Sequence, residues 1–213
     1  MAALAIAQPV HASPITPGQT LSPVPSSGDC DGCSGPFLAD TGVQAWSVNS
    51  FFHGFYRSVV FDSDPGAGVL LDFYYQIVVS ANADATVSRL TMSDFTGWAT
   101  DVFYVDPGGG GSSGRFPASA DRNAAGSLVG FNFDPFVGPG FATQVMVIRT
   151  NASNFTAGSL GIFGPAGSTA VAAFQPSGTP AVPEPGSLLL LGTGVVALRR
   201  RLAKRWAASR ASC

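Results

Sequence analysis

Charged side chains are scarce in this sequence, and two kinds are almost missing. Only 11% of the 213 residues are Asp, Glu, Lys or Arg, less than half of the usual share of about 25%. Lys204 is the one lysine and Glu184 the one glutamate. A nucleic-acid partner is not expected, because few basic groups are available to neutralise phosphate.

The charges that are present are unevenly distributed. Six of the 11 basic residues follow residue 198, whereas 12 of the 13 acidic residues are aspartates that precede Val182. Up to Val182, five arginines face twelve aspartates, which gives a formal charge of −7. These arginines are Arg57, Arg89, Arg115, Arg122 and Arg149.

Residues for catalysis are also few. Beyond residue 12 the chain has one histidine, His53, and no glutamate precedes Glu184. A Ser-His-Asp triad would need His53, and no nucleophile-elbow sequence selects a serine for it. Paired carboxylates for glycoside hydrolysis could come only from aspartates, which are scattered through turns. We therefore expect no catalytic residues and no enzymatic activity.

Between residues 37 and 176 the pattern is that of strands. Short apolar or alternating runs recur about every ten residues, with turn residues between them and no helical period. This predicts an all-β fold, a β-sandwich of jelly-roll or immunoglobulin-like kind. The continuous apolar runs Leu70–Val79 and Val145–Ile148 predict central strands that are covered on both faces. The expected strands are 43–49, 52–61, 69–80, 85–93, 101–105, 126–133, 143–150, 159–163 and 169–174.

Aromatic residues are expected to fill the space between the sheets. The expected core aromatics are Phe51, Phe52, Phe55, Tyr56, Phe73, Tyr74, Tyr75, Phe131, Phe133 and Phe136. Turns are expected at Asp62–Gly66, Asp134-Pro135, Gly138–Gly140 and Gly164-Pro165.

The first 36 residues divide into two segments. Residues 1–12 are apolar and end Val10-His11-Ala12, which predicts a signal peptide cleaved before Ser13. Its short apolar region and missing basic start indicate a truncated signal peptide, and a disordered N-terminus is the alternative. Residues 13–36 are rich in Pro, Gly and Ser and predict an irregular, exposed arm.

The C-terminal region has three parts in a fixed order. A linker, 177–182, leads into Val182-Pro183-Glu184-Pro185, where two prolines favour an extended peptide. The run 186–198 would measure only about 20 Å as a helix, against about 30 Å of hydrocarbon. Arg199, Arg200 and Arg201 favour a cytoplasmic end. The predicted short transmembrane helix, 187–198, includes Leu188, Leu189, Leu190, Leu191, Gly192, Thr193, Gly194, Val195, Val196, Ala197 and Leu198.

These three parts resemble the PEP-CTERM sorting signal of Gram-negative bacteria, here over residues 183–205, with 206–213 as a cytoplasmic tail. The resemblance implies that an exosortase cuts the chain near the Pro-Glu-Pro element. It implies export across the inner membrane, transient anchoring there, and a destination at the cell surface or in the extracellular matrix. A plain single-span anchor is the alternative.

Three cysteines are present, and two of them form a Cys30-Asp31-Gly32-Cys33 sequence. No second C-x-x-C occurs, so a zinc site lacks half of its ligands. In an exported protein we expect a local disulfide between Cys30 and Cys33, with metal binding as the alternative.

No cofactor is expected. Calcium is an alternative, because Asp62-Ser63-Asp64 and Asp29–Gly32 offer oxygen ligands in turns, although neither continues as an EF-hand loop.

From these observations we expect an exported, exosortase-processed surface or matrix protein. Its β-sandwich would have no catalytic role and would be associated with exopolysaccharide. The alternative is a carbohydrate-binding module in which Trp46, Trp98 or Tyr104 stacks on sugars. Exposed aromatic faces in a row on one sheet would favour the alternative.

Overall fold

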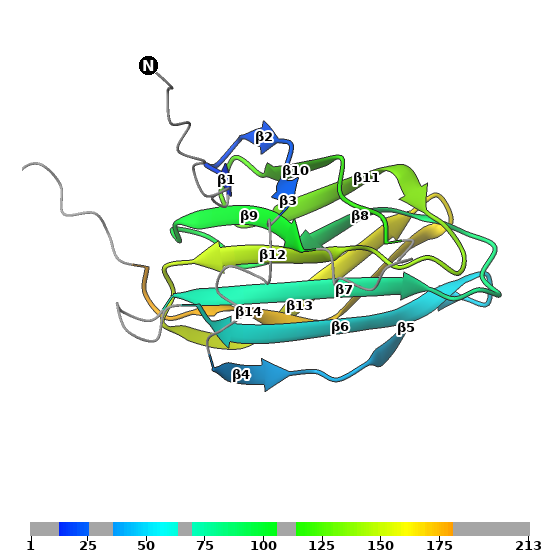
Figure 1. Ribbon diagram of the computed structural model, residues 1–213, viewed down its shortest axis with the longest axis horizontal. Coiled ribbons are helices and arrows are strands. Elements are labelled where there is room, and N and C mark those ends of the chain that lie inside the picture. Colours follow the sequence, from blue (N-terminus) through cyan, green and yellow to red (C-terminus); the bar gives the residue numbers. More distant parts are fainter. Residues whose placement is uncertain (1–12, 26–35, 64–69, 106–113, 181–213) are drawn as a thin grey trace, which may run out of the picture. The chain divides into compact units, whose positions relative to one another are not determined.

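The protein is described by a computed structural model over residues 13–25, 36–63, 70–105 and 114–180. By its internal contacts the chain divides into two units, Met1–Pro180 and Ala181–Cys213, and the described residues all belong to the first. Within these residues the regular structure is entirely β (Figure 1). The all-β prediction is confirmed, and the predicted helix 187–198 lies outside the described residues.

One sheet has eight strands, and its central members are the long ones. In spatial order it contains β1 (Ser13–Pro14), β9 (Thr100–Val105), β12 (Val145–Thr150), β7 (Leu71–Val79), β6 (Phe52–Asp62) and β4 (Phe37–Asp40), with β3 (Val24–Pro25) also beside β9 and β5 (Gln44–Asn49) also beside β6. All neighbours pair antiparallel except β3 and β9.

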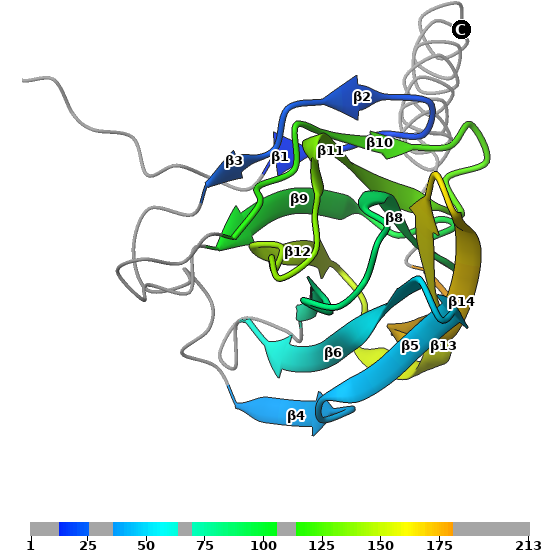
Figure 2. The ribbon, with the colours of Figure 1, turned by 90° about the vertical axis from the view of Figure 1, so that its right-hand side faces the viewer.

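The other sheet has six strands, all antiparallel. Its order is β14 (Gly167–Ser177), β13 (Asn154–Gly164), β8 (Val87–Met92), β11 (Val129–Val137), β10 (Ser119–Arg122) and β2 (Thr20–Leu21). Figure 2 looks along the strands, with β9, β12 and β6 of the first sheet on one side and β8, β11, β13 and β14 of the second sheet on the other.

The main core lies between the sheets because side chains alternate along each strand. Phe73, Tyr75 and Ile77 point inward from β7, and Leu90 of β8 and Phe131 of β11 meet them from the other sheet. All five are fully buried. Burial of this apolar surface is the main favourable term in folding, at about 25 cal/mol per Å².

A second apolar cluster lies on the outer face of the eight-stranded sheet. It contains Val59, Tyr74, Phe103, Val105 and Val147, all buried. Strands β7 and β12 therefore bury side chains on both faces, as their continuous apolar runs predicted.

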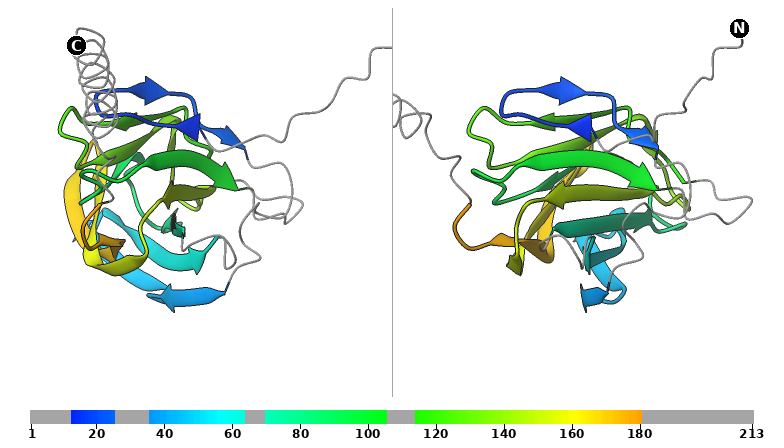
Figure 3. Two further views of the ribbon diagram at one scale, coloured as in Figure 1. Left: turned by 90° about the vertical axis from the view of Figure 1, so that its left-hand side faces the viewer. Right: turned by 60° about the vertical axis from the view of Figure 1, so that its left-hand side comes forward.

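The N-terminal segment differs from the irregular arm predicted for residues 13–36. Its described part forms three short strands: β1 and β3 pair with β9 in one sheet, and β2 pairs with β10 in the other. Ile15 is buried in the main core, and its N–H donates to the carbonyl of Thr100 at 2.8 Å. The segment thus joins both sheets along one side (Figure 3). Strands of two residues are too short to give a periodic pattern, so the sequence showed only the prolines.

Arg122, the last residue of β10, is the polar centre of this side. It is 4% exposed. Its guanidinium donates to the carbonyls of Ile15, Gly126, Phe95 and Trp98 at 2.5–3.1 Å. These carbonyls come from three separate loops, and no carboxylate accepts a bond from Arg122 among the hydrogen bonds of the described residues. Because desolvation disfavours the charged form, burial lowers the pKa of Arg122.

At the opposite side, two side chains of the eight-stranded sheet hold the backbone of β14. The hydroxyl of Tyr75 donates to the carbonyl of Phe174 at 2.6 Å. The N–H of Phe174 donates to Oγ of Ser58 at 3.2 Å. A residue of the edge strand β14 is thus hydrogen-bonded across the layer boundary, and both partners are buried.

Some sequence predictions within the fold were wrong. Phe51, Phe55 and Phe136, expected in the core, are exposed. Tyr74, also expected between the sheets, is buried in the cluster on the outer face of the eight-stranded sheet. Phe51 lies in the turn before β6, and Phe55 lies at an outward position of β6. The turn expected at Asp134-Pro135 is instead an irregular part of β11, where the register with β8 shifts between Asn132 and Val137.

The buried guanidinium leads to a stability prediction. We expect Arg122→Met to lower the free energy of unfolding by about 3 kcal/mol or more, because it leaves several buried carbonyls without donors. Urea unfolding followed by tryptophan fluorescence would measure it. Arg57→Met is the control, since Arg57 is half exposed and its ion pair should contribute within about 1 kcal/mol. Equal losses in both variants would contradict the special role of Arg122.

Candidate functional site

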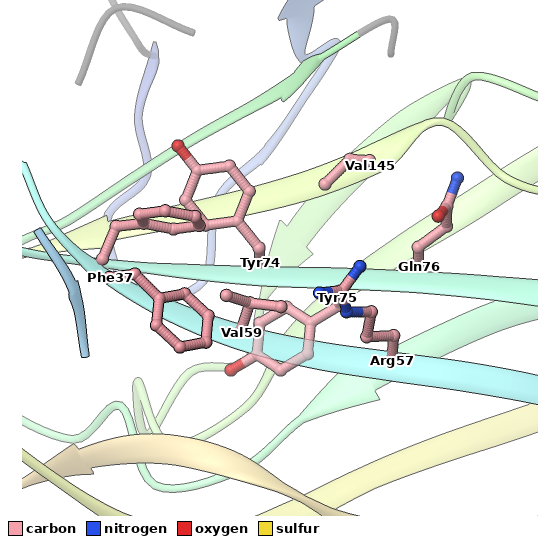
Figure 4. Close-up of a pocket in the computed structure, with 8 residues that line it drawn as sticks. Phe37, Arg57, Val59, Tyr74, Tyr75, Gln76 and Val145 are labelled. Atoms are coloured by element: carbon pink, nitrogen blue, oxygen red, sulfur yellow. The ribbon is translucent and has the colours of Figure 1, made fainter. Parts of the chain in front are cut away.

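A pocket of about 210 Å³ lies on the outer face of the eight-stranded sheet. Strands β4, β6, β7 and β12 provide its lining. Figure 4 shows Phe37 and Tyr74 toward one end and Arg57 and Gln76 toward the other. The lining residues are Phe37, Arg57, Val59, Phe61, Tyr74, Tyr75, Gln76 and Val145.

The aromatic end of the pocket is built by edge-to-face contacts. The rings of Phe37 and Phe61 are 5.8 Å apart at 74°, and those of Phe61 and Tyr74 are 4.9 Å apart at 66°. Phe37 is 55% exposed, whereas Tyr74 is buried, and burial raises the pKa of Tyr74. The packed rings of Tyr74 and Phe61 therefore lead to the ring of Phe37, which solvent can reach.

The polar end is fixed by an ion pair. Arg57 donates from Nε to Oδ1 of Asp40 at 3.0 Å and from Nη2 to Oδ2 at 2.7 Å. The N–H of Gly42 also donates to Oδ1 of Asp40 at 2.8 Å. The hydrogen bonds from Arg57 hold the pKa of Asp40 below its usual range. Because the bidentate geometry fixes the guanidinium plane, Arg57 is presented in one orientation.

A second ion pair lies farther along the same face. Arg149 donates from Nε to Oδ1 and from Nη2 to Oδ2 of Asp72, both at 2.8 Å. Its guanidinium also lies 5.4 Å from the ring centre of Phe103. Burial raises the pKa of Asp72, and Arg149 offsets part of that rise. Asp101 is the partner of Arg149 in the β9–β12 register, and its pKa is also raised by burial.

The tryptophans proposed for sugar stacking are buried. Trp46 is 3% exposed and Trp98 is 7% exposed. Trp46 packs against Phe52 at 4.9 Å and donates from Nε1 to the carbonyl of Phe55 at 3.1 Å. Tyr104 is partly exposed and stacks on Phe116 at 6.2 Å. The solvent-accessible aromatics of the outer face are therefore not those that the sequence suggested.

His53 forms no contact with a serine or a carboxylate among the hydrogen bonds of the described residues. Its Nε2 donates to Oδ1 of Asn82 at 3.2 Å, and its Nδ1 is buried without a partner. No group of three or more His, Cys, Asp or Glu side chains that could hold a metal occurs within the described ranges.

The remaining predicted site residues lie outside the described residues. They are Cys30 and Cys33, the sorting motif Val182–Pro185, the apolar run 188–198 and the arginines 199–201.

The pocket residues of β6 were missed because only their odd-numbered positions along the strand distinguish them from its core residues. Positions 55, 57, 59 and 61 of β6 alternate with the buried positions 54, 56, 58 and 60. The sequence does not decide which set faces the core, because apolar and aromatic residues occur in both sets. Phe37, in the short β4, gave no periodic signal.

The raised pKa of Asp101 gives a pH-dependent prediction. Since the rise belongs to the folded state, ionised Asp101 costs folding free energy above that pKa. We expect Asp101→Asn to raise the free energy of unfolding at pH 7 by less than about 1 kcal/mol, as for a partly exposed charge. The gain should vanish below about pH 3.9, the ordinary value for Asp. Urea unfolding at pH 3 and pH 7 would measure it, and a loss at pH 7 would show that attraction to Arg149 dominates.

Comparison with known proteins gives one match, and it falls in the C-terminal unit. Residues 181–205 match the family model described as the PEP-CTERM protein-sorting motif. No curated protein and no solved structure matches the chain. Within the described residues, no helix has the length and apolarity needed to cross a bilayer. The chain therefore carries a PEP-CTERM protein-sorting motif, which indicates an exported protein that an exosortase processes.

Proposed function

We propose that the protein is a surface or extracellular-matrix component whose β-domain has no catalytic role and associates with exopolysaccharide. The observation that carries this proposal is the match of residues 181–205 to the sorting motif. A sorting signal acts on the chain that bears it, so the delivered part is the unit that precedes residue 181. In this proposal the two sheets form a sandwich of jelly-roll or immunoglobulin-like kind.

The contacts of the polar groups support a non-catalytic role. Asp40, Asp72 and Asp121 are each bonded by an arginine, so their lone pairs serve the fold. Within the described residues, the guanidinium of Arg122 donates hydrogen bonds only to backbone carbonyls. Within the part of the chain that the structure describes, the ring of His53 bonds to Asn82 and not to a serine or a carboxylate, which a triad needs.

The carbohydrate-binding alternative is supported in a different form. Burial of Trp46 and Trp98 removes two of the three residues on which it first depended. The outer face of the eight-stranded sheet instead offers Phe37 and Phe55, both exposed, beside a pocket.

Processing can be tested at the motif itself. We expect replacement of Pro183, Glu184 and Pro185 by alanine to leave the chain uncut and in the membrane fraction, because the extended acidic peptide is lost. Intact-mass analysis of membrane and extracellular fractions would measure it. The matched control is Pro180→Ala, one residue before the matched segment. A wild-type extracellular species that still ends at Cys213 would contradict exosortase processing.

Association with the matrix is tested separately. In cells that make exopolysaccharide, we expect the wild-type protein to sediment with the matrix. In cells that do not make it, the protein should appear in the cell-free medium. Immunoblots of the fractions would measure the distribution. An unchanged distribution would contradict the proposed association but not the processing.

A further inference from the structure

We propose that the outer face of the eight-stranded sheet binds a neutral polysaccharide strand along β6, with sugar rings over Phe37 and Phe55 and hydrogen bonds to Arg57 and Gln76. This inference rests on the proposed association with exopolysaccharide. It assigns that association to one surface and to one class of ligand.

The surface has an apolar, polar, apolar order along β6. Phe55, Arg57, Val59 and Phe61 are alternate residues, so their side chains leave the same face of the strand. Phe55 and Phe61 lie about 20 Å apart at 3.3 Å per residue. Phe37 packs against Phe61 at one end. At the other end Phe55 lies beside Val78, which is its cross-strand partner on β7.

The size of the pocket fits part of a long ligand. Its volume is about 210 Å³, less than the range of about 300–1,000 Å³ that encloses whole drug-sized ligands. The exposed ring of Phe37 stands at its aromatic end (Figure 4). One sugar ring fits here, with the rest of the strand lying along the open face.

Sugar rings match the aromatic side chains by chemistry. The face of an aromatic ring is negative in its quadrupole, and the C–H groups on one side of a pyranose ring are weakly positive. Phe37 and Phe55 are 55% and 46% exposed, so each can offer a ring to solvent.

The middle of the surface offers polar atoms that the fold does not use. Arg57 and Gln76 are cross-strand partners on β6 and β7. Arg57 bonds Asp40 through Nε and Nη2, and Gln76 donates from Nε2 to the carbonyl of Thr143 at 3.1 Å. In the described part of the chain, Nη1 of Arg57 and Oε1 of Gln76 have no hydrogen-bond partner. A sugar hydroxyl can accept a hydrogen bond from Nη1 of Arg57 and donate one to Oε1 of Gln76.

The charges favour a neutral ligand over an anionic one. Both arginines of this face, Arg57 and Arg149, are already bonded to carboxylates. Among the described residues of this face, Asp40, Asp72 and Asp101 are set against these two arginines, an excess of one negative charge. The chain up to residue 182 has a formal charge of −7, so an anionic polymer would be repelled.

A peptide fits the surface less well than a sugar strand. Pairing with a peptide as an added strand needs a free sheet edge, but β6 is paired with β7 on one side and with β4 and β5 on the other.

Affinity electrophoresis of the full chain tests the proposal. Native gels would contain hydroxyethyl cellulose, galactomannan or dextran as neutral probes, and alginate as the anionic probe. We expect retardation by at least one neutral polymer and none by alginate. Phe55→Ala and Phe37→Ala should each weaken binding about tenfold, equivalent to about 1.4 kcal/mol.

The matched control is Phe136→Ala. Phe136 is 47% exposed, close to Phe55, but it belongs to β11 in the other sheet. Equal urea midpoints for the three variants and the wild type would establish that any loss of binding is not a loss of folding. Phe136→Ala should bind as the wild type does.

The outcomes separate this inference from the proposed function. If the wild type binds a neutral polymer and the Phe37 and Phe55 variants bind equally well, the surface assignment is overturned, while association with exopolysaccharide stands. If no neutral polymer retards the wild type, or alginate alone does, the ligand class is overturned. The fractionation of cells with and without exopolysaccharide then decides the proposed function independently.

Discussion

The buried guanidinium of Arg122 is the constraint on which one whole side of the domain depends. Its donors reach carbonyls in the segment after β1, in the loop between β8 and β9, and in the turn between β10 and β11. A charged group in a dry interior is stable only when its donors are satisfied. These three loops must therefore close together around it, and the N-terminal segment is held between the two sheets as a result.

The sequence predicted the long central strands because their apolar residues carry a direct signal of burial. The run at β7 indicated a strand covered on both faces, and Tyr74 and Phe73 lie in clusters on opposite faces. It could not predict the short strands, since pairing of two residues depends on tertiary contacts such as those of Ile15. The outer surface also escaped prediction: Phe55 has the same residue type as Phe52, and only the direction of its side chain distinguishes a surface ring from a core ring.

The two units of the chain carry different kinds of information. The C-terminal motif is recognised as a peptide, so residue type and order are enough to identify it. The preceding domain would be recognised by its folded surface, where β4, β6 and β7 bring together residues that are far apart in sequence. This is why the sequence indicates export plainly, while the ligand has to be argued from Phe37, Arg57 and Gln76 in three dimensions.

The hydrogen bonds of Tyr75 and Ser58 with the backbone of Phe174 have a mechanical consequence. Strand β14 ends at Ser177, and the chain then continues toward the sorting motif, so tension applied through the tail enters the domain at this strand. The load is shared by the ladder with β13 and by the cross-layer bonds to Ser58 and Tyr75. Detaching β14 from its C-terminal end therefore requires breaking hydrogen bonds to both sheets.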